Sequence, residues 1–132
     1  MRLMLFAAAA TATASAPPSA APVTHAQIDV PRTRPQQVIV QSRDFAPGSE
    51  SGWHVHPGTE VAYVTAGQLE LQVQGKTTVL GPGDSFTMPR GVAHNGANPG
   101  SATARAVITL VVDKGAAPRQ PVAPPREAVP SR

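Results

Sequence analysis

The chain has 132 residues, among them one tryptophan, one tyrosine, three phenylalanines and no cysteine. This length allows one small domain, and the lack of cysteine excludes disulfides, thiolate metal sites and cysteine nucleophiles. The formal net charge is +3, but residues 27–112 carry six basic and six acidic side chains, with no basic stripe among aromatics, which argues against nucleic-acid binding.

Residues 1–26 have the pattern of a secretory signal peptide. Arg2 precedes an apolar run that is too short to span a bilayer, and small residues typical of a cleavage site follow. Cleavage after Ala26 is favoured over cleavage after Ala16, which would leave a proline at the new N-terminus. We therefore expect a periplasmic or secreted protein with a linker over residues 27–35 and no membrane span. An uncut, alanine-rich leader is the alternative.

Residues 36–112 predict strands, because short alternating runs are separated by glycine and proline and no helical period persists. Residues 69–73 place leucine and valine on one face, and Gly75 with Lys76 predicts a hairpin turn before residues 77–80. Phe86 and Met88 also share a face. Residues 102–112 alternate so that Arg105 points away from the core. Many short strands at regular spacing indicate an antiparallel sandwich or barrel.

Residues 113–132 form a proline-rich tail, with five prolines between Ala117 and Arg132. Proline disfavours helix and inner strand, and the tail has little apolar surface to bury. We expect an extended, mobile segment. A proline-rich ligand for a partner domain is the alternative.

Residues 52–60 read GWHVHPGTE and predict a metal site. Residues i and i+2 of a strand point to the same face about 7 Å apart, so His54 and His56 project together. Pro57 and Gly58 predict a turn, and a following strand that folds back antiparallel would bring Glu60 beside the imidazoles. Imidazole nitrogens and a carboxylate together suit a transition metal.

A second segment, GDSFTMPRGVAHNGAN over residues 83–98, completes a larger pattern. The chain reads G-x5-H-x-H-x3-E-x6-G and then G-x5-P-x-G-x2-H-x3-N, which resembles the two signature motifs of the cupin superfamily. Every fixed position is filled, by Gly48, His54, His56, Glu60, Gly67, Gly83, Pro89, Gly91, His94 and Asn98.

The cupin resemblance covers residues 36–112. It implies an all-β fold, the double-stranded β-helix or jelly-roll barrel, with one divalent metal held by His54, His56, Glu60 and His94. The glycines, Pro89 and Asn98 are expected to shape the backbone.

Three imidazoles and one carboxylate make a nitrogen-rich ligand set. Calcium and magnesium prefer oxygen ligands, so iron, manganese, nickel, cobalt, copper and zinc remain. An octahedral ion would keep two adjacent positions for a chelating substrate, or for substrate and dioxygen. The net positive charge of such a site favours anionic oxygen donors such as enolates or phenolates.

The resemblance is nearest in type to small quercetin dioxygenase-like cupins. It implies a metal-dependent dioxygenase-like oxidoreductase acting on a small enol- or phenol-type substrate, with Glu60 as the catalytic proton acceptor. Thiol dioxygenases usually lack the ligand glutamate. Oxalate decarboxylases need an inward arginine and a further acid; the sequence indicates no inward arginine, although Arg90 could reach the pocket mouth.

Sugar isomerases of the superfamily remain an option, and the main alternative is a non-catalytic cupin that binds or senses a small molecule or metal. Trp53, Tyr63 and Thr65 point away from the site by parity, so they offer no further acid or base. The resemblance also suggests a homodimer, which fits the apolar residues on both faces of residues 36–41.

Overall fold

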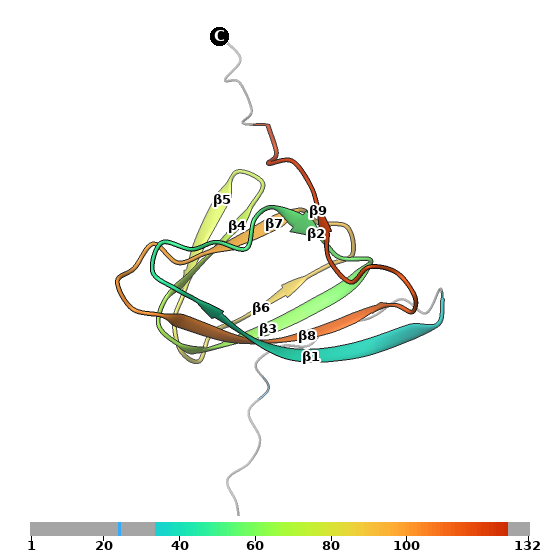
Figure 1. The fold of residues 1–132 in the computed structure, drawn as a ribbon, viewed down its shortest axis with the longest axis horizontal. Coiled ribbons are helices and arrows are strands. Elements are labelled where there is room, and N and C mark those ends of the chain that lie inside the picture. Colours follow the sequence, from blue (N-terminus) through green and yellow to red (C-terminus); the bar gives the residue numbers. More distant parts are fainter. Residues whose placement is uncertain (1–23, 25–33, 127–132) are drawn as a thin grey trace, which may run out of the picture.

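The computed structural model describes residue 24 and residues 34–126, which form two antiparallel β-sheets that face each other (Figure 1). The four-stranded sheet has the order β1 (Gln36–Phe45), β8 (Ala104–Asp113), β3 (Gly58–Ala66), β6 (Ser85–Met88). The five-stranded sheet has the order β5 (Lys76–Leu80), β4 (Leu69–Val73), β7 (His94–Ala97), β2 (His54–Val55), β9 (Gln120–Pro121).

The predicted all-β barrel of short antiparallel strands is confirmed. No helix within the described residues is long and apolar enough to cross a membrane. The predicted signal peptide, apart from residue 24, and both of its candidate cleavage positions lie outside the described residues.

The core between the sheets follows the alternation of the sequence. β8 buries every second residue, and its buried apolar members are Ala104, Ala106, Ile108, Leu110 and Val112. Arg105 points outward, as predicted, and pairs with Asp44 on β1. Leu69 and Leu71 are buried from β4 of the facing sheet, and Met88 is buried from β6 of the same sheet as β8. Each such side chain contributes about 1.5–3 kcal/mol when it leaves water, so the alternation itself selects which face of each strand points inward.

Two details of the strand boundaries differ from the sequence analysis. Val73 pairs with Lys76, so the β4–β5 turn is formed by Gln74 and Gly75, one residue earlier than predicted. Gly58 is the first residue of β3 and pairs with Val112, so it does not belong to a turn. Gly75 has a φ of 71°, a conformation that favours glycine and so suits its place in this turn.

The buried amide of Asn98 has the structural role that was predicted for it. Its Nδ2 donates to the carbonyl oxygens of Phe45 and Ala102, each at 2.8 Å, and its Oδ1 accepts from the Gly100 N–H at 2.9 Å. Asn98 therefore ties the end of β1 to the loop that leads into β8.

Gly58 gives the first stability prediction. An added Cβ would lie 2.0 Å from the Val111 carbonyl oxygen, which is backbone and cannot move away without disturbing the β3–β8 pairing. We expect Gly58→Ala to abolish folding or to lower the free energy of unfolding by about 3 kcal/mol or more. Gly81→Ala is the matched control, because its Cβ would meet only the Asp84 carboxylate at 3.9 Å. Urea unfolding that gave equal midpoints for the two variants would contradict this prediction.

Residues 113–126 differ from the predicted extended tail, of which residues 127–132 lie outside the described part of the chain. β8 continues to Asp113, and the chain then crosses to the other sheet, where β9 pairs with β2 (Figure 1). β9 is the last strand in the order of its sheet, where a missing proline N–H is tolerated. The sequence pattern correctly disfavoured an inner strand, but it did not show that the edge of the five-stranded sheet, at β2, was free to pair with this segment.

Candidate metal centre

The four predicted ligands come together from both sheets. His54 on β2 pairs directly with His94 on β7, so two imidazoles lie side by side in the five-stranded sheet. His56 follows β2, and Glu60 lies on β3 of the other sheet. β3 pairs with β6 and β8 and not with β2, so Glu60 reaches the imidazoles across the barrel interior and not by the predicted hairpin.

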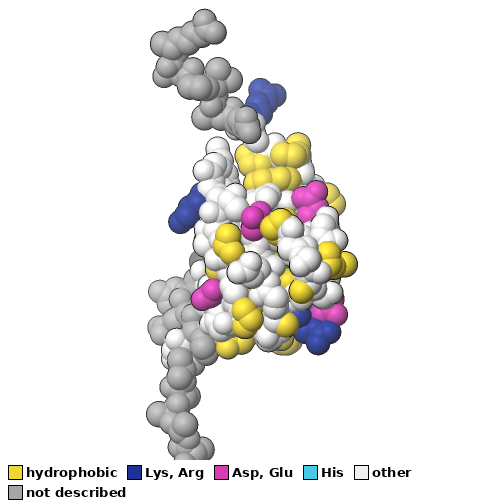
Figure 2. All heavy atoms as spheres, turned by 90° about the vertical axis from the view of Figure 1, so that its left-hand side faces the viewer, with side chains coloured by type: hydrophobic (Ala, Val, Ile, Leu, Met, Phe, Trp, Pro, Cys, Tyr) yellow, Lys and Arg dark blue, Asp and Glu magenta, His cyan; other side chains and the backbone are white. Residues whose placement is uncertain are grey.

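The ligand atoms form one tight cluster. Glu60 Oε2 lies 3.0 Å from His56 Nε2 and 2.8 Å from His94 Nε2, and one ligand atom from each of the four residues lies within 4.8 Å of the others. Each of the four residues is at most 5% exposed. Figure 2 accordingly shows one face of the described chain on which no histidine is visible, with apolar side chains scattered among polar ones.

Backbone carbonyls orient all three imidazoles in the same way. The Nδ1 atoms of His54, His56 and His94 lie 2.7, 2.6 and 2.9 Å from carbonyl oxygens. A carbonyl only accepts, so each Nδ1 carries the proton, and in the neutral ring the lone pair is on Nε2. Such contacts hold metal-ligating histidines in one tautomer and one orientation.

This donor set fits a metal ion. His56 Nε2 is buried and has no hydrogen-bond partner among the described residues. It lies with His94 Nε2 around one carboxylate oxygen, so lone pairs would face each other unless a cation, a proton or a metal ion, lay between them. A metal ion bound by His54, His56, Glu60 and His94 would meet the lone pairs of the imidazoles and neutralise the buried carboxylate.

The electrostatics of the cluster keep Glu60 ionised. Burial opposes ionisation, but hydrogen bonds and charge interactions with His56 and His94, in the form in which these rings carry a proton on Nε2, outweigh it and lower the pKa of Glu60 to about 2. Burial lowers the pKa of His54 to about 4. At neutral pH the cluster therefore offers a carboxylate anion and an uncharged His54 imidazole, as metal binding requires.

Two small cavities adjoin the cluster, of about 30 and 160 Å³, and both are lined by Arg43, His54 and Glu60. Apolar side chains such as Leu71 and Ile108 form much of the first wall, and Arg119 lines the second. A larger hollow of about 720 Å³ lies elsewhere, against the β4–β5 turn, and none of its lining residues is a histidine or a carboxylate.

The expectation of no inward arginine is wrong. Arg43 faces the interior from β1, with its guanidinium 4.9 Å from the ring centroid of Phe45. The signal was present in the sequence, because Arg43 shares strand parity with Ile39 and Phe45. Arg119 had no such signal, since it follows the part of the chain that was expected to form strands.

The other side chains considered from the sequence do not line these cavities. Arg90 donates two hydrogen bonds to Asp113, at 2.7 and 2.8 Å, and so does not reach the pocket mouth. Trp53, Tyr63 and Thr65 are likewise absent from both linings, as parity predicted. Glu60 is the one carboxylate among the residues that line the two cavities, so the further acid of an oxalate decarboxylase is not found there.

Comparison with known proteins identifies the family. Residues 42–112, more than half of the chain, match the cupin domain family. The chain belongs to the cupin family. The matched residues contain all four candidate metal ligands and both strands that carry the paired histidines, so the cupin resemblance seen in the sequence motifs is confirmed.

Two plant relatives are similar to this cupin over part of their length. A germin-like protein 3-7 of Oryza sativa subsp. japonica is 35% identical over 79 residues, which is 55% of this chain and 34% of that protein. Oxalate oxidase 2 of Hordeum vulgare is 31% identical over 103 residues, 70% of this chain and 46% of that protein. The chain thus spans less than half the length of these relatives.

Solved structures show the same fold. An oxalate oxidase in complex with the substrate analogue glycolate is 32% identical, with a TM-score of 0.52 over 55% of this chain and 41% of that one. A cupin-like protein from Thermotoga maritima is 27% identical, with a TM-score of 0.56 over 64% of both chains.

Proposed function

We propose that this cupin is a metal-dependent oxidoreductase in which His54, His56, Glu60 and His94 hold one divalent transition-metal ion. The observation that carries the proposal is that backbone carbonyls orient three imidazoles in the same way, with Nε2 of His56 and of His94 beside one Glu60 carboxylate oxygen and His54 in the same cluster. The similarity to oxalate oxidases supports an oxidoreductase that uses dioxygen as the oxidant. When bound, the metal would supply Lewis-acid and redox chemistry.

The residues around the ion favour a small anionic substrate. Both cavities fall well below the roughly 300 Å³ at which pockets for drug-sized molecules begin. Arg43 adds a positive charge beside the cluster. A small enol, phenol or acid that binds as an oxygen anion therefore fits better than a flavonol-sized molecule.

Glu60 is the candidate proton acceptor. Its ionised carboxylate lies in both cavity walls, and no second carboxylate lines them. A carboxylate whose pKa is about 2 is a weak base, so it can take a proton only from a donor that is itself made acidic. A substrate hydroxyl next to a divalent cation meets this condition.

Oxygen consumption tests the proposed activity. Anaerobically purified protein would be loaded with each candidate metal, and oxygen uptake would be measured with catechols, diketones, flavonols, thiols, oxalate and glycolate. We expect uptake with a small oxygen-donor class and none with thiols. Metal-loaded protein that consumes no oxygen with any of these compounds would contradict an oxidoreductase.

A binding or sensing cupin is the second candidate. One observation favours it: Glu60 is the one acid among the residues that line the cavities, so these residues offer no second carboxylate for acid–base catalysis. Such a protein would show metal-dependent ligand affinity in calorimetry without oxygen uptake, so the same metal-loaded samples distinguish the two functions.

We also propose that the protein is exported, on the signal-peptide pattern of residues 1–26. Expression in a Gram-negative host should give a periplasmic product whose intact mass corresponds to a start near Gln27. A soluble cytoplasmic pool that retains Met1 would contradict export.

A homodimer through β1 is the proposed assembly. β1 is an edge strand of its sheet, and Val38 and Val40 on its outer face are 65% and 67% exposed. An edge strand with exposed apolar residues favours pairing with a second copy. Light scattering should give a dimer mass that falls to the monomer mass in Val38→Lys/Val40→Lys. Val79→Lys, 58% exposed on β5, is the control, and dissociation by that variant alone would place the interface elsewhere.

A further inference from the structure

Residues 113–122, which begin with the last residue of β8, are hydrogen-bonded to the barrel at both ends, although they lie outside the region that matches the cupin family. At the first end, the Asp113 carboxylate accepts two hydrogen bonds from Arg90, and the Lys114 N–H donates to the Pro35 carbonyl at 2.9 Å. At the second end, the Val122 N–H donates to the Trp53 carbonyl at 3.0 Å, beside the β2–β9 pairing. We call residues 113–122 the strap.

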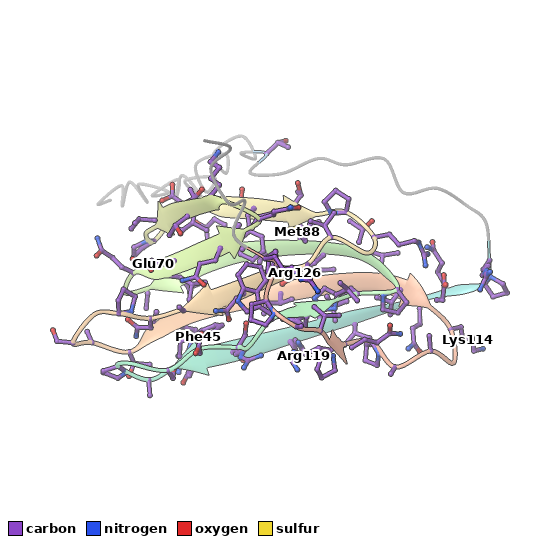
Figure 3. The ribbon with its side chains drawn as sticks, turned by 90° about the horizontal axis from the view of Figure 1, so that it is seen from above. Phe45, Glu70, Met88, Lys114, Arg119 and Arg126 are labelled. Atoms are coloured by element: carbon purple, nitrogen blue, oxygen red, sulfur yellow. The ribbon has the colours of Figure 1, made fainter. Side chains whose placement is uncertain are left out.

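The strap lies beside the four candidate metal ligands. The Pro118 carbonyl oxygen accepts from His56 Nδ1 at 2.6 Å, so the strap fixes the tautomer and ring orientation of one candidate ligand. Both Pro118 and Arg119 line the cavity of about 160 Å³ next to His56 and Glu60. In Figure 3, Arg119 lies between Phe45 and Lys114 along the length of the barrel.

The Arg119 guanidinium is only partly used by the protein. Its Nη2 donates to the Ser51 carbonyl and, at 3.2 Å, to the Gly52 carbonyl. Its Nε is buried and has no hydrogen-bond partner among the described residues. A buried N–H without an acceptor is costly, about 1–3 kcal/mol, so the guanidinium of Arg119, a residue of the cavity wall, has donor capacity left for an acceptor bound in the cavity.

Together with Arg119, Arg43 gives the cavity of about 160 Å³ the positive charge that suits an anion. Arg43 and Arg119 line the same cavity, while Glu60 is the one carboxylate in its wall. Burial, followed by repulsion from Arg119, lowers the pKa of Arg43, which indicates that the two positive charges lie close enough to interact. With a divalent metal in the cluster, the cavity would carry a clear excess of positive charge.

We propose that the strap supplies a substrate-binding residue, Arg119, which together with Arg43 holds a small carboxylate anion beside the metal cluster. This inference rests on the proposed metal site and adds to it the substrate class and a specificity-determining residue. One carboxylate oxygen accepts from Arg119 Nε and the charge is shared with Arg43, while a second oxygen donor of the same molecule lies toward Glu60 and the histidines. Arginine suits this role because its planar guanidinium matches a carboxylate.

Calorimetry on the full-length, metal-loaded protein tests the proposal. Glycolate is the anionic probe, and glycolamide is a neutral probe of nearly the same shape. In Arg119→Gln we expect the Kd of glycolate to rise about 10- to 100-fold, the range for loss of a hydrogen bond to a charged group, with little change for glycolamide. Arg119→Lys should recover part of the affinity. Arg105→Gln, on the outer face and paired with Asp44, is the matched control and should bind glycolate as the wild type does.

The metal content of each sample separates this proposal from the proposed function. Wild-type protein that takes up no metal would contradict the metal site itself. Wild-type protein that holds metal but binds glycolate no better than glycolamide would overturn the carboxylate site and leave the metal site standing. An Arg119→Gln variant that loses metal, or that loses both probes equally, would show that Arg119 only supports the structure and would overturn its role in binding.

Discussion

Glu60→Gln is expected to lower turnover by 10²–10⁴-fold, the usual effect of losing a general base. The amide keeps the size of the side chain and can still place an oxygen near the ion, so we expect part of the metal and most of the fold to remain. Steady-state kinetics and metal analysis on the same sample measure both effects.

The comparison with the histidine variants decides what Glu60 does. If Glu60→Gln loses as much metal as His54→Ala, His56→Ala and His94→Ala, then Glu60 is only another ligand and the base role has no support. If the protein is a binder, the affinity for its ligand should change far less than 100-fold in Glu60→Gln.

Metal removal is the second prediction with a large effect. A metal that binds only the folded chain stabilises it by about 2.7 kcal/mol when free metal is a hundredfold above Kd. In a domain of this size, that change lowers the Tm by about 10 °C on chelation. His54→Ala and His94→Ala should melt at the chelated wild-type temperature, because each removes a nitrogen donor from the paired strands β2 and β7.

The thermal test has an internal control. Chelator should have no further effect on a histidine variant that already lacks the metal. A wild-type Tm that does not respond to chelation or to added metal would contradict a metal that stabilises the fold.

That these four side chains lie together was predictable from the local spacing of His54, His56 and Glu60 and from the cupin resemblance, which added His94. His54 and His56 are two residues apart around a short strand, and the second motif supplies His94. Only the direction from which Glu60 arrives was wrong. It depends on β3 joining the other sheet, a non-local pairing with β8 that spacing alone does not determine.

The charged part of the pocket was predicted less well. Arg43 could have been found, because it alternates with Ile39 and Phe45, whose side chains pack inward from the same strand. Arg119 and Pro118 could not have been found from the sequence. A high proline content predicts that helix and inner strand are absent, but it does not show that the edge of a sheet is free to pair with the segment. The close approach of Gly58 to Val111 is likewise a tertiary contact without a local signature.

The central claim is that four buried side chains hold one transition-metal ion, and metal stoichiometry tests it most directly. Protein purified without chelator, or reconstituted anaerobically and desalted, should contain about one ion of iron, manganese, nickel, cobalt, copper or zinc per chain by elemental mass spectrometry. His54→Ala, His56→Ala and His94→Ala should each lose nearly all of it, while the surface variant Arg105→Gln should retain it. Wild-type protein that retains no metal after reconstitution, or histidine variants that retain as much as the wild type, would contradict the account.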